Sequence, residues 1–582
     1  MIWVFWNPGK EATILWSKEG VTQEGDPLTM MLYGIAILPL AHLLKMEYPS
    51  VLQPWYADGF AMIGLHALNA KVLKLLMEKG PCFGYYPEPQ KSLHICSEAE
   101  AEEASAMAAF DAEGLQVSFT RGQRYVGGYI GSAETQEEWL APMVVKWTEA
   151  VKTLAAVAGR YPQTAYAGFA MCLQSEWQYV CRTTPGVAPA MAPVEAAIRD
   201  IFLPSLFGGS QTVNLSDNFR CMLSQSVKQA GLGIRNPVLA GDRLHQASQE
   251  ACRELVSSLV SGSQLDLQDH VTCVRGAGVR ARTERLESEK LFVKESGLEK
   301  GKHATHRLMR ACAAGSWLGV VPNRLNGTEL CALEFRDNLR LRYGLRPLEL
   351  QERCDGCGAG FTVQHGLSCK VGGLIIRRHE AGRHEFQHLC ELAFGKSRVD
   401  HEPFIFYGGD ATAMAGEAAA GGRKRKARSV AGNEARGDLS VDGFWKAGMT
   451  CILDIRITDT DCKSNIANPP QKTLDKAERE KKAKYSKPCA EQRRHFTPLV
   501  YSPDGMPGTE TRAAEKRLAA QLAAKLDRPY SEMAGFVRQR MSLAVVRQNT
   551  LLLRGARVRR NYGERPVMMD GAGMEDMRSR EW

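Results

Sequence analysis

The sequence predicts a multidomain protein of α/β and α class, and three observations support this. First, its 582 residues are too many for one hydrophobic core, because single cores stop growing at about 250–300 residues. Second, residues 1–135 alternate short apolar runs with glycine and proline, as α/β units do. Third, residues 138–350 follow the period of helices, whereas β-rich runs return near residues 438–458. Prolines interrupt the helical part at Pro185, Pro189, Pro193, Pro204 and Pro237.

Composition and charge are ordinary for a globular protein, with 44% hydrophobic and 24% charged residues. The formal net charge is +9 and basic residues cluster in the second half, which permits nucleic acid as a partner. Met1–Trp6 is apolar but lacks the basic start and the cleavage site of a signal peptide. The apolar run Leu28–Leu44 contains Pro39 and His42, so we expect a buried helix there and no membrane partner.

A cluster of cysteine and histidine residues predicts a zinc site with the spacing Cys354-x2-Cys357-x7-His365-x3-Cys369. Four soft or borderline ligands are the number that a tetrahedral structural zinc requires. The other cysteines among the 16 are scattered, which favours a reducing intracellular compartment over a disulfide framework. A chance cluster of buried thiols is the alternative. Because protein ligands fill all four positions, we expect a structural or nucleic-acid-contacting role.

Two segments are expected to be disordered. Residues 408–434 are rich in alanine and glycine and cannot bury enough apolar area to fold alone. Residues 560–582 have a similar character. The first segment carries a basic run that we predict to bind nucleic acid, and this run consists of Arg423, Lys424, Arg425 and Lys426.

Four segments of the first third resemble reverse-transcriptase motifs, in the same order and at the same spacing. Glu19–Leu28 resembles the Gly-Val-x-Gln-Gly-Asp-Pro-Leu motif that precedes a long palm helix, and Trp55–Gly59 lies where the family has Tyr-Ala-Asp-Asp. Gly84–Ser92 resembles the next motif, and Tyr125–Gly131 resembles the primer-grip segment. The resemblance implies a remnant of a polymerase site at Gln23, Gly25, Asp26, Asp58 and Lys91.

The departures from the reverse-transcriptase pattern concern its carboxylates. Nucleotidyl transfer needs carboxylates that hold two metal ions about 4 Å apart. The chain begins after the strand that supplies the first of them, and Gly59 replaces the second Asp of the hairpin, which leaves Asp58. We therefore expect an inactive partial palm at 1–135, followed by a helical thumb and connector at 138–350. Self-association or a partner would have to supply the missing half.

A pair of aspartates is predicted to converge on a β-hairpin. Leu439–Trp445 and Met449–Thr458 are β-rich runs, and counting outward from a turn near residue 446 places Asp438 opposite Asp454. Cross-strand side chains lie about 5 Å apart, which is close enough for two carboxylates to share one hard cation such as Mg²⁺.

The aspartate pair also resembles the Pro-Asp…Asp/Glu-x-Lys pattern of restriction-like endonucleases, with Gly437 in place of proline. Arg456 stands where the pattern has lysine. Arginine stays protonated, so it can stabilise a charged transition state but cannot take a proton from water.

In the retrotransposon branch of these nucleases the lysine lies on the following helix, within a Lys-x-x-Lys-Tyr motif. Lys481, Lys484 and Tyr485 match that motif, on a helix expected to begin near Leu474. These three positions share one helical face, so the resemblance implies that a lysine points at the metal site. A solvated, charged helix face is the alternative for this stretch.

Further residues upstream resemble the same nuclease pattern. Arg378 and His379 are implied contacts to nucleic acid, and Glu385 and Glu402 are implied as additional metal ligands. A structural role is the alternative for each of them.

The resemblance implies a zinc knuckle at 351–372 and an endonuclease core at 373–407 and 435–555. Together these features imply the C-terminal part of a non-LTR retrotransposon polyprotein that acts in the nucleus. Its partners would be target DNA and element RNA, and its cofactors structural zinc and catalytic magnesium. Two alternatives stay open: an inactive relic, and a nucleic-acid-binding protein without catalysis.

Overall fold

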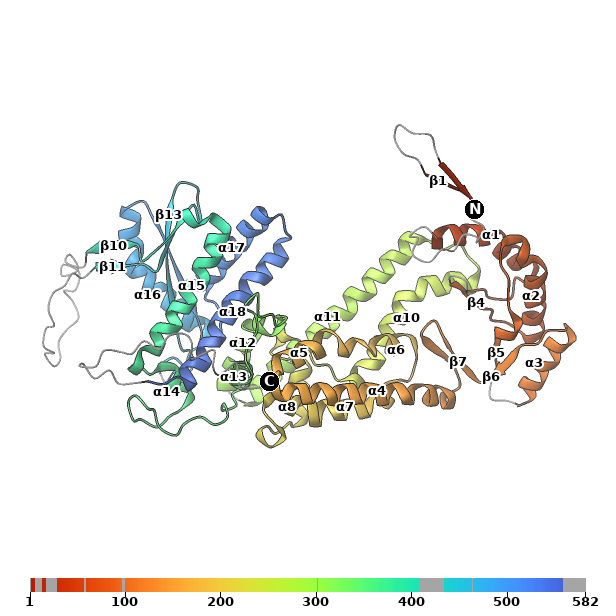
Figure 1. The fold of residues 1–582 in the computed structure, drawn as a ribbon, viewed down its shortest axis with the longest axis horizontal. Helices are drawn as coiled ribbons and strands as arrows, with labels where there is room; N and C mark the ends of the chain where they lie inside the picture. The colour runs from red at the N-terminus through yellow and green to blue at the C-terminus, as the bar shows by residue number, and fades with distance from the viewer. Residues whose placement is uncertain are drawn as a thin grey trace. The chain divides into compact units, whose positions relative to one another are not determined.

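A computed structural model describes residues 2–5, 13–16, 29–56, 59–96, 100–300, 302–407, 434–462 and 464–557. The protein is mixed α/β and mostly helical, with small sheets (Figure 1), which confirms the predicted mixture of the two classes. The chain forms two compact units that are each assembled from separated stretches. Unit 1 comprises Met1–Glu149, Ser175–Glu195 and Pro237–Leu286, and unit 2 comprises Ala150–Gln174, Ala196–Asn236 and Glu287–Trp582.

Unit 1 contains helices and two-stranded sheets. The strands pair as β1 with β2, β3 with β4 and β7 with β8, all antiparallel, and β5 with β6 in parallel. The elements are β1 (Ile2–Phe5), β2 (Thr13–Trp16), α1 (Thr29–Glu47), β3 (Trp55–Tyr56), β4 (Gly59–Phe60), α2 (His66–Lys79), β5 (Leu93–Ile95), α3 (Glu100–Ala112), β6 (Ser118–Thr120), β7 (Gly122–Tyr125), β8 (Gly128–Gly131), α6 (Gln178–Thr183) and α10 (Pro237–Ser261). Three helices run from one unit into the other: α4 (Ala133–Arg160), α7 (Ala192–Ala197) and α11 (Leu267–Lys300).

Helix α1 differs from the buried helix that its apolar sequence predicts. One face packs Leu40 and Leu44 against α2, but the opposite face leaves Met31, Ile35 and Leu38 at least half exposed, at 56%, 58% and 50%. Apolar composition alone does not reveal that, among the described residues of this unit, one side of the helix is covered and the other is exposed. Among the helices that the structure describes, none combines the length and apolar character needed to cross a membrane.

Unit 2 contains the larger sheet and the helices around it. Its elements are α5 (Pro162–Met171), α8 (Leu203–Phe207), α9 (Asp217–Ser224), α12 (Lys302–Ala313), α13 (Ala332–Arg342), α14 (Val363–Ser368), α15 (Leu374–Phe394), β9 (Val399–His401), β10 (Phe404–Tyr407), β11 (Glu434–Arg436), β12 (Leu439–Asp442), β13 (Thr450–Ile457), α16 (Pro470–Glu491), β14 (His495–Tyr501), α17 (Thr509–Leu526) and α18 (Tyr530–Arg554). The expected helix near Leu474 therefore begins earlier, at Pro470, where the fixed φ of proline suits a first turn.

A four-stranded sheet with the order β14-β13-β12-β9 is the centre of unit 2. β13 runs parallel to β14, whereas β12 is antiparallel to both β13 and β9. Because α16 connects β13 to the parallel strand β14, these three elements form a β-α-β crossover. Helices cover both faces of this sheet (Figure 1).

Alternate residues of β13 reach the two covering layers, as the pleat of a strand requires. Leu453 and Ile455 join the main core with residues of α15, α17 and α18. Ile452 faces the other way and packs against Tyr485 of α16. Asp454 has the same parity as Ile452, and it therefore points toward α16.

The predicted hairpin is present, but its first strand is shorter than expected. β12 ends at Asp442 because Gly443 adopts a left-handed conformation with φ 78°, and Phe444 then turns into the core with 0% exposure.

Candidate active site and metal centre

The hairpin register brings Asp438 beside Asp454. Leu439 pairs with Leu453, and the next pair outward is therefore Asp438 and Asp454, as counting from the turn predicts. The backbone N–H of Asp438 donates to the carbonyl oxygen of Leu453 at 3.1 Å. The carboxylate of Asp438 accepts a hydrogen bond from the backbone N–H of Ile455 at 2.5 Å, which fixes its orientation.

Asp454 is a buried carboxylate with one close cation. Its residue is 6% exposed, and Nζ of Lys481 forms an ion pair with its Oδ2. Burial raises the pKa of Asp454 because the charged form loses water, and the neighbouring Asp438 raises it further, whereas Lys481 lowers it. The two carboxylates therefore repel each other, which favours a cation beside them.

His379 lies on α15 and joins the pair from the other side of Asp438. Its Nε2 lies 3.1 Å from Oδ2 of Asp438 and 3.2 Å from the carbonyl oxygen of Ile455. Both neighbours are acceptors, so Nε2 carries a proton and donates. The hydrogen bond with Asp438 raises the pKa of His379. Burial lowers this pKa, but by less, so the pKa is raised overall.

Two residues that the sequence does not single out support this histidine. Glu380 lies 3.5 Å from Nδ1 of His379, and Arg383 donates from Nε to Glu380 at 3.0 Å. Arg383 is 7% exposed, and its hydrogen bond is the main cause that lowers the pKa of Glu380. The spacing of Glu380 and Arg383 by one helical turn is a signal for an ion pair, but the sequence does not show that this pair lies beside His379 and Asp438.

Helix α16 is held so that Lys481 faces the sheet. Glu478, one turn before Lys481, is 3% exposed and accepts hydrogen bonds from the backbone N–H groups of Glu510 and Thr511. A carboxylate at the first turn of α17 satisfies donors that have no partner within that helix. One turn after Lys481, Tyr485 packs between α16 and the sheet at 9% exposure. Both anchors fix the rotation of α16.

The remaining predicted residues of the nuclease pattern lie in different surroundings. Nζ of Lys484 lies 4.7 Å from the ring centroid of Tyr485, and Lys484 is exposed. Arg456 forms an ion pair with Glu480 of α16 at 3.0 Å. Of the two lysines, Lys481 is therefore the one that reaches an aspartate.

The two glutamates implied as metal ligands are not brought to the aspartate pair through their carboxylates. Glu385 forms an ion pair with Arg540 of α18, at 2.7 Å and 3.2 Å. Glu402 has an exposed side chain, and its backbone N–H donates to the carbonyl oxygen of Asp438 at 3.1 Å. Its φ of 50° directs the chain from β9 toward β10.

Arg378 is 4% exposed, so its guanidinium lies beneath the surface rather than on it. Burial lowers the pKa of Arg378 to about 10, although the nearby carboxylate of Asp459 acts to raise it. On α15, consecutive residues point about 100° apart, which is why His379 reaches the aspartate pair and Arg378 does not.

Most residues of the implied polymerase remnant and of the basic run lie outside the described residues. These are Gln23, Gly25, Asp26, Asp58, Arg423, Lys424, Arg425 and Lys426. Lys91 is described and forms an ion pair with Glu88 at 2.7 Å, with both side chains exposed. The strands that flank Asp58 form the predicted hairpin, since Tyr56 pairs with Gly59.

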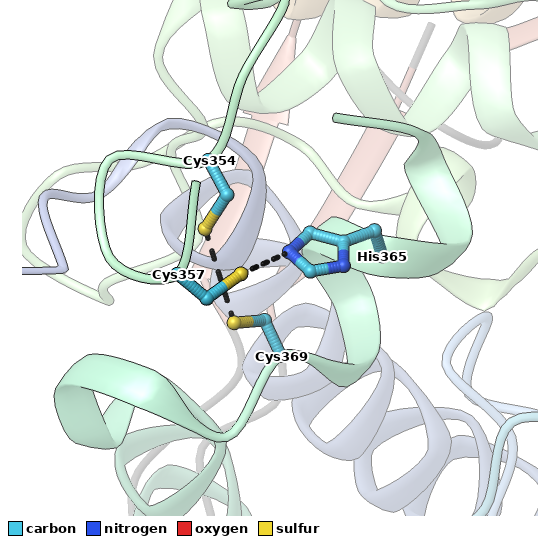
Figure 2. Close-up of side chains that lie close together, drawn as sticks. All are labelled: Cys354, Cys357, His365 and Cys369. Carbon is cyan, nitrogen blue, oxygen red and sulfur yellow. Dashed lines mark hydrogen bonds between the residues drawn. The ribbon is translucent and has the colours of Figure 1, made fainter. Parts of the chain in front are cut away.

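A second cluster brings together the four predicted metal ligands, which point toward one another in Figure 2. One ligand atom of each, from Cys354, Cys357, His365 and Cys369, lies within 4.8 Å of the others. Sγ of Cys354 lies 3.9 Å from Sγ of Cys369, and Sγ of Cys357 lies 3.3 Å from Nε2 of His365. Two sulfurs at about 2.3 Å from a tetrahedral zinc would be about 3.8 Å apart, so the cluster has the dimensions of a metal site.

The local fold explains why these residues converge. The backbone N–H of Gly358 donates to the carbonyl oxygen of Cys354 at 2.8 Å, and Gly358 has φ 75°, a conformation that glycine adopts at little cost. Thr362 caps α14 by accepting from the backbone N–H of His365 at 3.1 Å. Cys369 follows the last turn of that helix.

The surroundings of one thiol, that of Cys354, favour the form that binds a metal. Burial works to raise the pKa of Cys354, but hydrogen bonds from the backbone of Cys357 and Gly356 and from the side chain of His365 lower it overall. A metal binds the thiolate form, so a lowered pKa favours binding. Three cysteines and one histidine could bind a metal, and their donor set suits zinc.

The donor set of the aspartate pair suits a different ion. Asp438 and Asp454 offer hard carboxylate oxygens, which Mg²⁺ prefers; Nε2 of His379 contacts Asp438, and the ammonium of Lys481 contacts Asp454. No protein-family model matches the chain, and no curated protein does.

Proposed function

We propose that unit 2 contains a Mg²⁺-dependent endonuclease site that cleaves DNA phosphodiester bonds. The observation that carries this proposal is the convergence of Asp438, Asp454 and Lys481 from two strands and a crossover helix. Paired carboxylates with an adjacent lysine are the groups that metal-assisted hydrolysis of a phosphodiester requires.

Each residue has a role in this proposal. Asp438 and Asp454 would hold Mg²⁺, which neutralises the phosphate and lowers the pKa of a bound water. The water would lose a proton to solvent, its oxygen would form the new bond to phosphorus, and the leaving oxygen would take up a proton from solvent as its bond to phosphorus breaks. The ammonium of Lys481 would stabilise the negative charge that develops on the phosphate. His379 is a positioning residue, because it holds the carboxylate of Asp438 through a hydrogen bond.

Zinc at Cys354, Cys357, His365 and Cys369 would be structural, because the protein supplies all four ligands. Together with the motif resemblance of the first third, this supports a retrotransposon-derived protein with a defective polymerase region. By that resemblance, the nick in target DNA would prime reverse transcription of element RNA. This origin is part of the proposal.

The test is nicking of supercoiled plasmid with and without added Mg²⁺. The wild-type protein is expected to convert supercoiled plasmid to the open circle only when Mg²⁺ is present. Asp454→Asn is expected to lower the rate by at least about 100-fold, because it removes a charge from the metal site.

The matched control is Asp442→Asn, at the other end of the same hairpin, where Asp442 accepts a hydrogen bond from Thr450. This variant is expected to nick at the wild-type rate. Equal activity of wild-type protein and Asp454→Asn would refute the proposal, as would the absence of nicking by a wild-type preparation with its zinc intact. Zinc content, measured on every variant, separates a folding defect from a catalytic one.

A further inference from the structure

The outer face of α16 carries exposed cations that the proposed chemistry does not use. Lys472, Lys476, Arg479 and Lys487 are exposed and follow one another at intervals of one or two helical turns. Residues at such spacings gather on one side of a helix. We call these four residues the basic face of α16. They lie on the side opposite to the buried Leu474 and Ala477.

The carboxylates of the same helix do not neutralise this basic face. Glu478 is buried at the start of α17, and Asp475 accepts hydrogen bonds from Gln471 and Thr509. Glu480 is engaged with Arg456, and exposed Glu491 lies in the last turn. Within the described part of the chain, no ion pair involves any of the four cations. Asp475, Glu480 and Glu491 lie one helical turn from these cations, yet none of the three forms an ion pair with them in the part of the chain that the structure describes.

The dimensions and place of the basic face suit an extended polyanion. From Lys472 to Lys487 the helix rises about 22 Å, which corresponds to about six base pairs of duplex DNA at about 3.4 Å each. Lys484, also exposed, lies on the same helix between the basic face and Lys481. A chain of cations therefore leads from the outside of α16 toward the aspartate pair.

We infer that the basic face of α16 binds the phosphate backbone of duplex DNA next to the cleavage site. This rests on the proposed function, because the surface would hold the substrate that the site cleaves. Charge complementarity supports it: cations without partners gain most from a polyanion, since each neutralised phosphate releases condensed counterions. The binding is independent of base sequence, because lysine and arginine contacts to phosphate carry no sequence information.

The experiment measures binding without cleavage. Fluorescence anisotropy follows a labelled 30-base-pair duplex at several KCl concentrations without divalent cations, on proteins that also carry Asp454→Asn. In this background, changing Lys472, Lys476, Arg479 and Lys487 to glutamine is expected to reduce the slope of log affinity against log salt by about 2–4. This corresponds to about one unit for each lost phosphate contact.

The matched control changes four exposed cations elsewhere on unit 2 to glutamine: Lys396, Arg398, Lys446 and Lys516. It is expected to keep the slope of its parent within about one unit. Equal slopes for the basic-face variant and its parent would overturn the inference, and so would an equal loss in the control. If the parent binds duplex with the expected slope but the wild-type protein does not nick plasmid, the proposed function fails and the inference stands. Nicking together with an unchanged slope would refute the inference alone.

Discussion

The contact between Lys481 and Asp454 separates two lysines that the sequence leaves equivalent. Both Lys481 and Lys484 match the motif, and they are one turn apart. Only the register of α16 on the sheet decides between them, and that register is set by Glu478 and Tyr485, whose partners are remote in sequence. This is why the local pattern predicts a lysine at the site without identifying which one.

The two lysines are therefore predicted to differ in their effect on catalysis. Lys481→Met removes the ammonium beside Asp454 and is expected to lower single-turnover nicking by about 100-fold, which is typical for a lost transition-state donor. Lys484→Met removes a charge over the Tyr485 ring and is expected to cost less than about tenfold. Quench-flow or gel kinetics at saturating Mg²⁺ measures both. A larger loss in Lys484→Met than in Lys481→Met would reverse the assignment.

A buried glutamate in the core of unit 2 makes stability depend on pH. Glu515 of α17 is 5% exposed and accepts a hydrogen bond from the hydroxyl of Tyr501 at 2.9 Å. Burial raises the pKa of Glu515 to about 7 from an ordinary value of 4.5, although Tyr501 and two arginines lower it. The pKa of Glu515 is therefore higher in the folded than in the unfolded protein. The stabilisation of the folded state by protonated Glu515 is fully present below about pH 4.5 and is lost as pH rises through about 7.

Glu515→Gln is therefore predicted to stabilise unit 2 more at pH 8 than at pH 5. The amide keeps an oxygen for Tyr501 and carries no charge, so it avoids a cost of up to about 3 kcal/mol at high pH. Thermal unfolding midpoints of wild type and variant at both pH values give the comparison. Glu532→Gln, at an exposed position of α18, is the control and is expected to show no such difference. If Glu515→Gln changed the thermal unfolding midpoint by the same amount at both pH values, the raised pKa of Glu515 would be contradicted.

At the scale of elements, the Cys–His cluster and helix α15 share one small core. Leu374, the first residue of α15, packs with Cys354, Phe361, Leu367 and Cys369. The Cys–His spacing predicts this cluster from sequence because its ligands are local, within one turn and one short helix. The link to α15 is not visible in the spacing, since it depends on packing against α18.

The protein is predicted to hold one zinc per chain, and Cys354→Ser is expected to lose most of it. Thiolate coordination contributes free energy to the local fold, so α14 and the first turn of α15 should lose protection from hydrogen exchange in this variant. Metal analysis and hydrogen-exchange mass spectrometry measure the two effects. Cys252→Ser, at an exposed position of α10, is expected to retain zinc. No zinc in a fresh, reduced wild-type preparation would count against the centre.

The contacts around the four-stranded sheet of unit 2 could be predicted to different degrees. The register of the β12–β13 hairpin could be counted because the connection between Asp442 and Thr450 is centred on residue 446 and each strand alternates with period two. The ion pairs Glu385–Arg540 and Arg456–Glu480 could not, because each joins residues from different elements. The exposure of one face of α1 could not be predicted either, because an apolar sequence does not specify which side of a helix other elements cover.

At the scale of the whole molecule, the two compact units are discontinuous in sequence. Stretches such as 150–174 and 196–236 belong to unit 2, although unit 1 includes the residues between them and those that precede and follow. Local sequence patterns indicate helices and strands but do not indicate which separated stretches form one compact unit. The continuous domains expected from the sequence therefore remain predictions. The mixture of α and β agrees with the sequence.

The polypeptide as a whole is predicted to lack template-directed DNA synthesis. The motif resemblance of the first third includes one hairpin aspartate, Asp58, and two-metal chemistry needs further carboxylates. Primer extension on poly(rA)/oligo(dT), with a viral reverse transcriptase as positive control, gives the answer. Incorporation above background that is lost in Asp58→Asn would show that the polymerase region is active.

Asp438 and Asp454 are proposed to share a divalent cation beside Lys481, and Mn²⁺ binding measures this. Mn²⁺ suits carboxylate ligands like Mg²⁺ and is visible by electron paramagnetic resonance. Zinc-loaded wild-type protein and Asp442→Asn are predicted to bind Mn²⁺ at one or two sites, and the Asp438→Asn, Asp454→Asn double variant is predicted to lose that binding while keeping its zinc. Equal Mn²⁺ binding by the double variant and the wild-type protein would show that Asp438 and Asp454 do not hold the cation.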